Sequence, residues 1–361
     1  MRVIFSGGGT GGHIYPALSI IDELKNTVPD VEILYVGKKG SLEEELVTRE
    51  GIDFATIRVK GLPRKKINKD SFLSLYELMK GLKDASGIIK RFKPHLVFGT
   101  GGYVCAPILL KAQMSGIPTM IQEQNAYPGK TNRLLGRRVQ SICLSFPEAE
   151  EYFPGEVKKV FTGNPIRRAF RDAVSQASGE EQLVLSFGGS GGQESTNEAV
   201  LEMMRDHPHP PFQLIHITGK DHYEKFVADA EKFGGWDENA YTVLNYSHEI
   251  PELLKKSHLV IASSSAMTLA EISAMGLPSI LIPKAYTAGN HQWHNAKSYE
   301  RAAASLVIEE EELTGAKLYA GMEKILGDRE LSASMGEASR AMANPRADEK
   351  IVEEILRVVG S

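Results

Sequence analysis

Residues 3–13 have the sequence VIFSGGGTGGH, in which a short apolar run leads into a turn that is rich in glycine. The amphipathic pattern of residues 16–25 follows and predicts a helix. Glycines in such a strand–turn–helix unit let backbone N–H groups approach a ligand closely at the helix N-terminus. Because this end of a helix carries partial positive charge, it attracts phosphate and other anions. The opening of the chain therefore predicts an α/β domain with an anion-binding turn.

The first half of the chain continues this alternation of short apolar runs and amphipathic segments. Further strands are predicted at residues 33–37, 54–59, 96–100, 119–122 and 141–144, with helices at 71–91 and 103–115. Nearly continuous apolar strands separated by helices are typical of parallel strands covered on both faces. We therefore predict a doubly wound α/β domain.

The pattern restarts near the middle of the chain. An apolar run at 183–187 is followed by Gly188-Gly189-Ser190-Gly191-Gly192 and by a helical pattern at 194–205. Strands at 213–218, 242–245, 259–262 and 279–283 continue this second half, and residues 312–359 are largely helical in pattern. The polar stretch 172–182 is the best candidate for a linker. Two domains of the same architecture are therefore expected.

Composition excludes several classes of protein. The 361 residues suffice for two domains, and a net charge of −4 argues against a nucleic-acid binder. Two cysteines, Cys105 and Cys143, make neither a disulfide framework nor a zinc-binding spacing, as expected for a reducing cytosol. Neither a signal peptide nor an apolar run long enough to span a membrane is evident, so membrane contact is expected to be peripheral.

The first glycine turn also fits a dinucleotide site, because Gly7, Gly9 and Gly12 match the pattern G-x-G-x-x-G. Such a site needs an acidic residue at the end of the second strand, but this strand ends at Gly37 and Glu32 stands at its beginning. An NAD(P)-dependent oxidoreductase is thus disfavoured but stays open. An ATPase is disfavoured further, because neither glycine turn continues as G-K-[ST]. A turn that binds nothing is the structural alternative.

Two constellations in the second half could bind a sugar nucleotide. After the run 259–262, Thr268 and Glu271 fit a capping box, and spacing alone favours that structural role. Alternatively, Glu271 could accept hydrogen bonds from two ribose hydroxyls. Gln292 and Asn295, in an expected loop after the strand at 279–283, suit sugar hydroxyls.

A metal site is not expected in this half. His291 and His294 lie one helical turn apart, but no third ligand is evident, so they are expected to be exposed helix residues. The chain also has no Asp-x-Asp motif. Backbone N–H groups and an arginine would then bind the phosphates.

Seven motifs occur in the order found in the MurG family, within glycosyltransferase family 28, and the chain resembles that family over nearly its whole length. They are Gly8-Gly9-Thr10-Gly11-Gly12-His13, Gly101-Gly102-Tyr103, Glu123-Gln124-Asn125, Thr162-Gly163-Asn164-Pro165-Ile166-Arg167, Gly188-Gly189-Ser190, Thr268-x-x-Glu271 and His291-Gln292-x-x-Asn295. The resemblance implies the GT-B fold, an α/β architecture of two Rossmann-like doubly wound parallel-sheet domains facing across a cleft. It implies an acceptor domain at residues 1–163, a donor domain at 164–345 and a C-terminal helix at 346–361 that packs back on the first domain.

The resemblance further implies an activity. Family members transfer GlcNAc from UDP-GlcNAc to the C4 hydroxyl of the MurNAc of lipid I (undecaprenyl-diphosphate-MurNAc-pentapeptide), giving lipid II for peptidoglycan synthesis. The transfer inverts the anomeric centre and requires neither a metal nor another cofactor. The implied partners are UDP-GlcNAc, lipid I, an anionic membrane surface and proteins of cell-wall synthesis or division, with no nucleic acid. The implied location is peripheral, at the cytoplasmic face of the cell membrane.

Residue roles are carried over only where the motifs match. The donor would be bound by Thr10, Gly11, Gly12, Asn125, Arg167, Gly189, Ser190, Asn197, Tyr246, Ser247, Ile250, Met267, Thr268, Glu271, Gln292 and Asn295. The acceptor would be bound by Gly9, Gly12, His13, Gly102, Tyr103, Glu123 and Asn125. His13 is the candidate general base, because the pKa of a histidine ordinarily lies near neutrality, and Glu123 is the alternative base. The structural alternative is that His13 caps the helix or touches phosphate.

The chain departs from the family pattern near these residues. Gln122 stands where many relatives have a histidine, and Gly191-Gly192-Gln193 replaces the more usual Gln-Gly-Ala. Ser263 and Ser265 replace an arginine and a glycine. The differences concern fine contacts of the donor and leave Glu271, Gln292 and His13 in place.

A basic cluster precedes the predicted helix at 71–91. Lys65, Lys66 and Lys69 lie just before the apolar residues of this helix, among them Phe72, Leu75 and Met79. Basic side chains beside apolar ones suit an anionic bilayer surface, and the resemblance favours this interpretation. The alternative is an ordinary amphipathic helix whose apolar stripe lies in the core.

Two further hypotheses concern the class of the protein. Another GT-B transferase, such as a glycolipid synthase that uses diacylglycerol, would share the donor residues. A non-catalytic protein that binds nucleotide sugars would keep the donor turn but not His13, Glu123 and Asn125, so their presence favours an enzyme.

Overall fold

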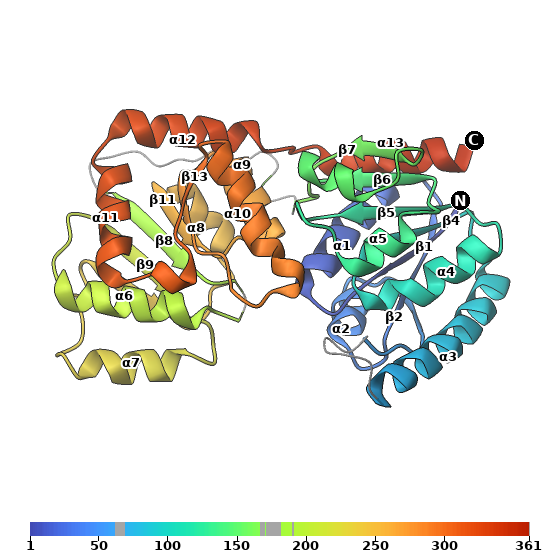
Figure 1. Cartoon of the computed structure of the whole chain (residues 1–361), viewed down its shortest axis with the longest axis horizontal. Helices are drawn as coiled ribbons and strands as arrows, with labels where there is room; N and C mark the ends of the chain where they lie inside the picture. Colours follow the sequence, from blue (N-terminus) through green and yellow to red (C-terminus); the bar gives the residue numbers. More distant parts are fainter. Residues whose placement is uncertain (62–68, 167–169, 171–181, 190, 361) are drawn as a thin grey trace. The chain divides into compact units, whose positions relative to one another are not determined.

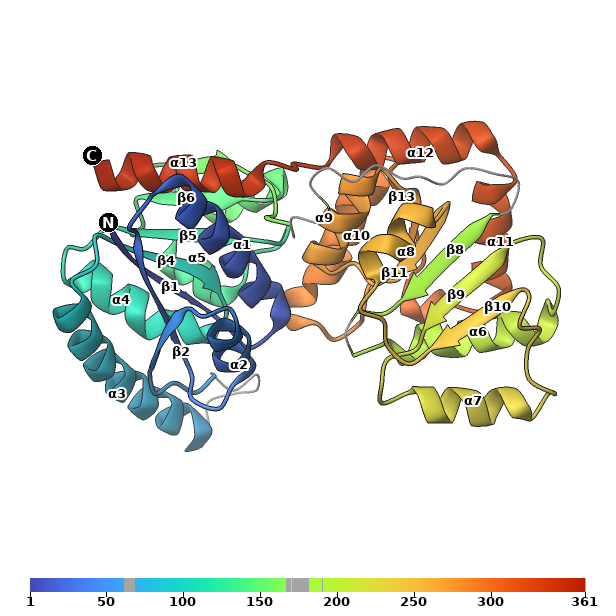
Figure 2. The same ribbon diagram turned by 180° about the vertical axis from the view of Figure 1, so that it is seen from behind.

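The computed structural model describes residues 1–61, 69–166, 170, 182–189 and 191–360. The chain forms two compact units, Met1–Arg167 together with Arg346–Ser361, and Arg168–Pro345. Each unit contains its own β-sheet, in which neighbouring strands are parallel (Figures 1 and 2). The prediction of two Rossmann-like parallel-sheet domains is confirmed.

The first unit has a seven-stranded sheet in the order β3-β2-β1-β4-β5-β6-β7. Its strands are β1 (Arg2–Gly7), β2 (Glu32–Gly37), β3 (Asp53–Thr56), β4 (Leu96–Gly101), β5 (Thr119–Glu123), β6 (Ser141–Leu144) and β7 (Lys158–Phe161). Its helices are α1 (Gly11–Thr27), α2 (Leu42–Arg49), α3 (Lys69–Phe92), α4 (Ala106–Met114), α5 (Lys130–Leu135) and α13 (Ala347–Gly360), with the 3-10 turns η1 (Tyr103–Cys105) and η2 (Pro147–Tyr152).

Alternate residues of the central strands pack on opposite faces of this sheet. In β1, Val3 and Phe5 belong to a buried cluster with α1 and α13, whereas Ile4 belongs to a second cluster with α3, α4 and α5. β4 divides in the same way. Both faces are therefore covered, which explains why these strands are apolar at nearly every position.

Helix α13 belongs to the first unit although it follows the whole of the second unit in the sequence. Its residues Ile351, Val352, Ile355 and Val358 are buried in one cluster with α1. Burial of each such side chain contributes about 1.5–3 kcal/mol. Glu354 on the same helix lies 2.8 Å from Lys158 of β7 and pairs with Arg357. Burial opposes ionisation of Glu354, but the hydrogen bonds from Arg357 and Lys158 outweigh it and lower the pKa of Glu354 to about 2.

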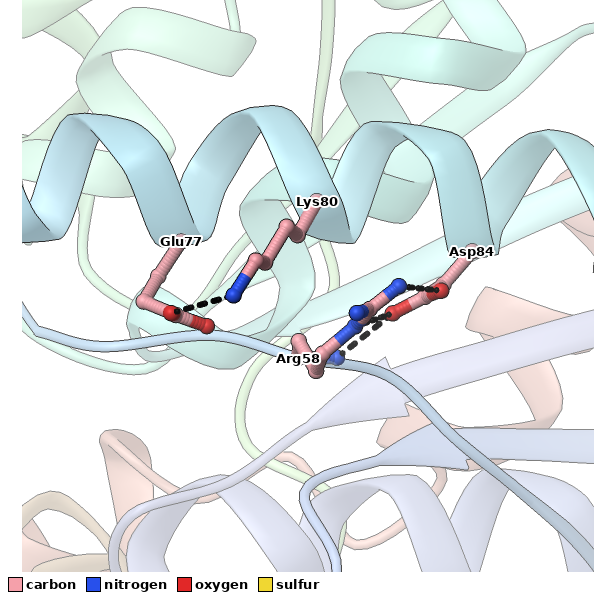
Figure 3. A network of polar contacts seen from close by, with 4 residues as sticks. All are labelled: Arg58, Glu77, Lys80 and Asp84. Atoms are coloured by element: carbon pink, nitrogen blue, oxygen red, sulfur yellow. Dashed lines mark hydrogen bonds and ion pairs between the residues drawn. The ribbon is translucent and has the colours of Figure 1, made fainter.

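Helix α3 is tied to the segment that follows β3. Figure 3 shows the guanidinium of Arg58 against the carboxylate of Asp84, with Glu77 and Lys80 one to two turns earlier on the helix. Nε and Nη2 of Arg58 donate to the carboxylate at 2.8 and 2.6 Å, and the backbone N–H of Arg58 donates at 3.1 Å. The hydrogen bonds from Arg58 lower the pKa of Asp84, so the pair is charged at neutral pH.

The second unit has a six-stranded sheet in the order β10-β9-β8-β11-β12-β13, which repeats the order of the first six strands of the other sheet. Its strands are β8 (Leu183–Phe187), β9 (Gln213–Ile217), β10 (Tyr241–Leu244), β11 (Leu259–Ala262), β12 (Ser279–Leu281) and β13 (Ser305–Val307). Its helices are α6 (Glu194–Asp206), α7 (Tyr223–Glu231), α8 (Ile250–Lys256), α9 (Ala266–Met275), α10 (His291–Arg301), α11 (Gly315–Leu326) and α12 (Arg329–Ala341), with the 3-10 turns η4 (Ala288–Asn290) and η5 (Glu310–Glu312).

Some details differ from the prediction. Helix α1 begins at Gly11 rather than at residue 16, so that Pro16 lies inside it. Proline is common at the first position of a helix and glycine is a poor helix former, which is why the sequence placed the start too late. The outermost strands β7 and β13 were not predicted, because edge strands are short and mix polar with apolar residues. None of the helices in the described ranges is long and apolar enough to cross a membrane.

We expect Ile355→Ala to lower the free energy of local unfolding of α13 by about 2–5 kcal/mol, because the removed side chain is fully buried against α1. Hydrogen exchange of the α13 amides in the full chain would measure this. Leu356→Ala is the matched control, because its side chain is 37% exposed. Equal acceleration of exchange in both variants would contradict the packing described.

Candidate functional site

The first candidate site lies at the carboxyl ends of β1, β4 and β5. β1 and β4 are neighbours, and the strand order runs in opposite directions on the two sides of this pair. Open α/β sheets bind ligands outside the carboxyl ends of the strands at such a switch point. Helix α1 starts four residues after β1, so its partially positive end lies at this edge.

The turns after β1 and β4 are in close contact. The backbone N–H of Gly8 donates to the carbonyl of Gly101 at 3.3 Å, and the hydroxyl of Thr100 donates to the carbonyl of His13 at 2.6 Å. Gly102 has a φ of +78°, and a Cβ there would lie 2.2 Å from the carbonyl oxygen of Gly8. Only glycine meets both conditions, so this residue brings the two turns together.

His13 lies in the first turn of α1 and is half-buried. Its Nδ1 is 3.0 Å from Oε1 of Gln124, at the end of β5. Burial lowers the pKa of His13, while hydrogen bonds with Gln124 and Thr100 oppose this shift. The imidazole is therefore neutral near physiological pH, and a neutral imidazole can accept a proton. The residue at the N-cap of α1 is Thr10, so His13 does not cap the helix.

Gln124 is part of a buried network of uncharged side chains. Gln122, which stands at the family's histidine position, is fully buried, and its Nε2 donates to Ser145 and to Asn164 at 3.0 Å each. Asn164 in turn donates to the carbonyl of Gln124 at 3.0 Å. Gln122 therefore fills its position with amide hydrogen bonds rather than with a titratable ring.

Glu123 is 1% exposed, and both of its oxygens are engaged. Oε1 accepts hydrogen bonds from the backbone and side-chain N–H groups of Asn125, at 3.0 and 3.1 Å. Oε2 accepts from the backbone of Gly129 at 3.2 Å and from Asn132 at 2.9 Å. Burial raises the pKa of Glu123, and these hydrogen bonds oppose the rise. The carboxylate thus organises the turn between β5 and α5.

The other predicted residues of the first unit lie around His13. Gly9, Thr10 and Gly12 are exposed, and the side chain of Thr10 makes no capping hydrogen bond. Tyr103 begins η1, and a Cβ on Gly9 would lie 3.7 Å from its ring. The structure therefore brings together the predicted acceptor residues, of which Gly12 and Asn125 are also predicted for the donor, and also Thr10 and Gly11, which are predicted for the donor alone.

The second candidate site lies at the carboxyl ends of β8, β11 and β12 in the second unit. Gly189 and Gly192 have φ values of +81° and +72°, and a Cβ on Gly192 would lie 2.0 Å from the carbonyl oxygen of Thr218. The turn leads into α6, whose N-terminus is again at the switch point, between β8 and β11. Arg167 and Ser190, both predicted to bind the donor, lie outside the described residues.

Lys284 and Glu310 support this glycine turn. Nζ of Lys284 donates to the carbonyl of Gly192 at 2.6 Å. Glu310 accepts from Gln193 at 2.8 Å, from Ser195 at 2.6 Å and from the backbone of Ala285 at 2.5 Å. Burial would raise the pKa of Glu310, but these hydrogen bonds and the charge of Lys284 outweigh it and lower the pKa. The pair links the turn to the segment after β12.

The capping box predicted at Thr268 and Glu271 is wrong. Ser265 is the N-cap of α9, and its hydroxyl accepts from the backbone N–H of Thr268 at 3.4 Å. The helix begins one turn earlier than the box requires, because Ser265 stands where the family pattern has a glycine and can itself cap. Glu271 consequently lies in the second turn of α9, not in the first, and is 9% exposed. Met267 precedes Thr268 in the first turn and is half-buried.

Gln292 and Asn295 lie in α10, not in the expected loop, because this helix already begins at His291. Oε1 of Gln292 accepts from the backbone N–H of Lys284 at 3.0 Å, so the amide nitrogen is the end that can donate to a ligand. Nδ2 of Asn295 donates to the carbonyl of Ser264 at 3.1 Å. His291 and His294 are half-buried in the same helix rather than exposed.

Asn197 has its amide engaged inside the second unit. It donates to the carbonyl of Thr218 at 3.1 Å, and its oxygen lies 3.0 Å from Nε2 of His216. Burial lowers the pKa of His216 to about 3, so this ring is neutral. Asn197 therefore joins α6 to the end of β9.

The remaining predicted donor residues follow β10. The ring of Tyr246 is 36% exposed, and Nζ of Lys220 lies 4.8 Å from its centroid. Ser247 accepts a hydrogen bond from the backbone N–H of Glu249 at 3.0 Å, and Ile250 begins α8. Among the side chains that the structure describes, no three of His, Cys, Asp and Glu form a group that could hold a metal ion.

The predicted membrane residues are only partly described. Lys65 and Lys66 lie outside the described residues, and the side chains of Lys69, Phe72 and Leu75 do as well. Met79 of α3 is 60% exposed and Tyr76, one turn earlier, is 56% exposed. Nζ of Lys80 lies 4.1 Å from the centroid of the Tyr76 ring. An exposed face with apolar and basic side chains is therefore present on α3.

Several residues that organise these sites have no signal in the sequence. Gln124 lies within Glu123-Gln124-Asn125 but has no pattern that predicts its contacts, and Asn132 is nine residues beyond Glu123 with no local pattern to connect them. Glu310 lies in a run of four glutamates that resembles a solvated surface, and Lys284 has no motif around it. Only the tertiary contacts identify these four residues.

Two family models match the chain. Residues 3–144 match the N-terminal domain of glycosyltransferase family 28, and residues 183–351 match the C-terminal domain of the same family. The matched ranges contain the two sheets except for β7.

Relatives and solved structures agree with these models. The chain is 44% identical to a protein of Finegoldia magna, over 99% of the chain and 98% of the relative, and 40% identical to one of Clostridioides difficile, over 100% and 90%. Both are named UDP-N-acetylglucosamine--N-acetylmuramyl-(pentapeptide) pyrophosphoryl-undecaprenol N-acetylglucosamine transferase. The crystal structure of MurG from Acinetobacter baumannii is similar with a TM-score of 0.80 and 26% identity, over 99% of each chain. The chain therefore belongs to glycosyltransferase family 28 and, within it, to the MurG family of glycosyltransferases.

Proposed function

We propose that this enzyme transfers GlcNAc from UDP-GlcNAc to the MurNAc of lipid I and so forms lipid II for peptidoglycan synthesis. The observation that carries the proposal is identity of 40–44% over essentially the whole chain with relatives named for this reaction. At the C4 hydroxyl of lipid I, the oxygen attacks C1 of GlcNAc while UDP departs, so the anomeric centre inverts. The acceptor proton needs a base, and the leaving diphosphate needs a positive environment.

The second unit is suited to hold the donor. The glycine turn after β8 leads into α6, so its backbone N–H groups and the helix dipole can stabilise the charge that develops on UDP. Lys284 fixes the carbonyl of Gly192 on this turn. Ser190 and Arg167 add contacts to the diphosphate in this proposal, Glu271 binds the ribose, and Gln292 donates its amide N–H to the sugar.

His13 is better placed than Glu123 to act as the general base. Glu123 already accepts four hydrogen bonds and is 1% exposed, so its oxygens are not available to a substrate hydroxyl. His13 is half-buried at the switch point beside the exposed turn of Gly9, Thr10 and Gly12. Its lowered pKa keeps it in the neutral, proton-accepting form at physiological pH.

Lipid I is membrane-bound, so the proposal includes a peripheral contact with the cytoplasmic face of an anionic membrane. The exposed side chains of Tyr76 and Met79 on α3, with Lys80 over the Tyr76 ring, favour α3 as the contacting element. Lys65, Lys66 and Lys69 precede this face in the sequence and add positive charge. Contacts with proteins of cell-wall synthesis or division are a further expectation from the family.

The defining experiment is transfer of radiolabelled GlcNAc from UDP-GlcNAc to lipid I by the purified full chain, with product identified as lipid II. UDP-glucose as donor and diacylglycerol as acceptor are the comparison substrates. Transfer to diacylglycerol but not to lipid I would refute the proposed acceptor. Binding of NADH without binding of UDP in calorimetry would refute the donor.

We expect His13→Gln to lower kcat about 10²–10⁴-fold, because it removes the proton acceptor. In the unsubstituted enzyme, kcat/KM should rise with pH through the lowered pKa of His13, below the ordinary value of 6.5, and stay flat above it. His95→Gln is the control. This histidine precedes β4 at the opposite end of the same sheet, and its Nδ1 accepts a hydrogen bond from the backbone N–H of Arg2. Near-normal turnover of His13→Gln would remove the base assignment.

Gln292→Leu should weaken binding of UDP-GlcNAc roughly tenfold, the equivalent of about 1.4 kcal/mol, while UDP binds within about twofold of normal. The reason is that the amide nitrogen serves the sugar and not the nucleotide. Calorimetry with both ligands would measure the two constants, with Gln213→Leu on the exposed side of β9 as control. An equal loss of affinity for UDP and UDP-GlcNAc would mean that Gln292 supports the segment around Lys284 rather than binding the sugar.

The paired substitution Tyr76→Ser and Met79→Ser should reduce sedimentation with phosphatidylglycerol vesicles about tenfold, because it removes apolar area from the exposed face of α3. High salt should reduce binding of the unsubstituted chain as well. Leu356→Ser, a change at an exposed apolar residue of α13, is the control. Unchanged sedimentation of the paired variant would exclude α3 as the contacting element.

A further inference from the structure

We propose that Gln124 is a positioning residue that holds His13 in the tautomer with the proton on Nδ1, so that Nε2 carries the lone pair. The catalytic consequence of this inference rests on the proposed role of His13 as base. The tautomer itself does not.

The orientation of the Gln124 amide is fixed by main-chain acceptors. Its Nε2 donates to the carbonyl of Thr100 at 2.6 Å and lies 3.4 Å from the carbonyl of Gln122. It also donates to the side-chain oxygen of Gln122. A carbonyl can only accept, so a rotated amide would place oxygen against oxygen. The nitrogen must therefore face Thr100, and Oε1 must face His13.

The position of the proton on His13 follows from this orientation. Oε1 of Gln124 lies 3.0 Å from Nδ1 and can only accept, so Nδ1 carries the hydrogen. In a neutral imidazole the other nitrogen, Nε2, is then the acceptor. Without such a partner, both tautomers would be populated and only a fraction of the molecules would present Nε2 as a base.

Both residues are held by the end of β4. The carbonyl of Thr100 accepts a hydrogen bond from the side-chain amide of Gln124, while the hydroxyl of the same threonine donates to the carbonyl of His13 at 2.6 Å. On the far side, Asn164 donates to the carbonyl of Gln124 at 3.0 Å. Gln124 is 1% exposed, so water does not compete for its amide. The geometry between ring and amide is therefore set by the fold.

The partner of His13 is an uncharged amide, and this choice has an electrostatic consequence. A carboxylate at the same place would stabilise the imidazolium and raise the pKa of His13. With glutamine, burial lowers that pKa and the ring stays neutral. The other ionisable side chains on α1 are Tyr15, Asp22, Glu23 and Lys25, and those on β2, α2, η1, β5 and α5 include Tyr35, Glu43, Tyr103, Cys105, Glu123, Lys130 and Arg133.

The test is ¹⁵N NMR of the full-length chain with labelled histidine, in which the resonances of His13 are identified by their loss in His13→Gln. In the unsubstituted protein we expect a protonated Nδ1 and a bare Nε2 at neutral pH. Gln124→Met should give a mixture of tautomers. Gln124→Glu has nearly the same shape but replaces the nitrogen that donates to Thr100 with an oxygen. Its carboxylate should still accept from Nδ1 and raise the titration midpoint of His13 by about one pH unit or more. Gln113→Glu on α4, in the same unit, is the control and should change neither.

Kinetics give the second readout. Gln124→Met should lower kcat at least tenfold with KM for UDP-GlcNAc within about twofold, and Gln124→Glu should move the acidic limb of the pH–rate profile upward by the same shift as in NMR. If neither the tautomer of His13 nor the pH–rate profile changes in either variant, the inference is overturned. If the tautomer changes as expected but His13→Gln retains turnover, the positioning role stands and the base assignment fails. If His13→Gln abolishes turnover but the tautomer is insensitive to Gln124, the base assignment stands and the inference fails.

Discussion

Both sheets are parallel throughout, and this constraint governs the rest of the molecule. Parallel strands need a crossover after every strand, so each strand delivers a turn to the same edge of its sheet. In the first unit, the first turn of α1 carries His13, and the turns after β4 and β5 carry Gly102 and Gln124. In the second unit, the turns after β8, β11 and β12 carry Gly192, Ser264 and Lys284. The chemistry is thus collected by topology rather than by proximity in the sequence.

The two sheet edges differ in the charge of the side chains that surround each candidate site. Around His13 the side-chain partners are amides and carbonyls, and the buried carboxylates of this edge, Glu43 and Glu123, accept N–H groups, two at Glu43 and four at Glu123. A buried carboxylate without such donors would cost several kcal/mol. The second edge keeps two charged side chains, because Lys284 donates to the carbonyl of Gly192 while Glu310 accepts from Gln193 and Ser195 on the same glycine turn. The first edge therefore suits the proposed proton acceptor, and the second suits the proposed anion site.

The sequence was a good guide to periodic features and a poor one to contacts. Glycine turns after apolar strands identified both domains, and the motifs around His13 and Gln292 lie at the carboxyl ends of the strands, where the candidate sites are. The start of α1 was missed because a proline at residue 16 imitates a helix beginning. The cap of α9 was missed because Ser265 and Thr268 are equally plausible caps without coordinates. Gln124, Asn132, Lys284 and Glu310 act through partners distant in sequence, and one sequence contains no signal for such pairs.

Helix α13 gives the first unit a discontinuous chain, with consequences for synthesis on the ribosome. The strands and helices that α13 covers are complete by residue 166, but α13 begins only at Ala347. At a synthesis rate of about 5–20 residues per second, the surface of α1 that α13 contacts stays exposed for on the order of 10–40 s. During that interval the nascent unit presents an apolar strip to solvent, where a chaperone or another nascent chain can bind it. The last helix of the chain is therefore also the last step that removes an aggregation hazard.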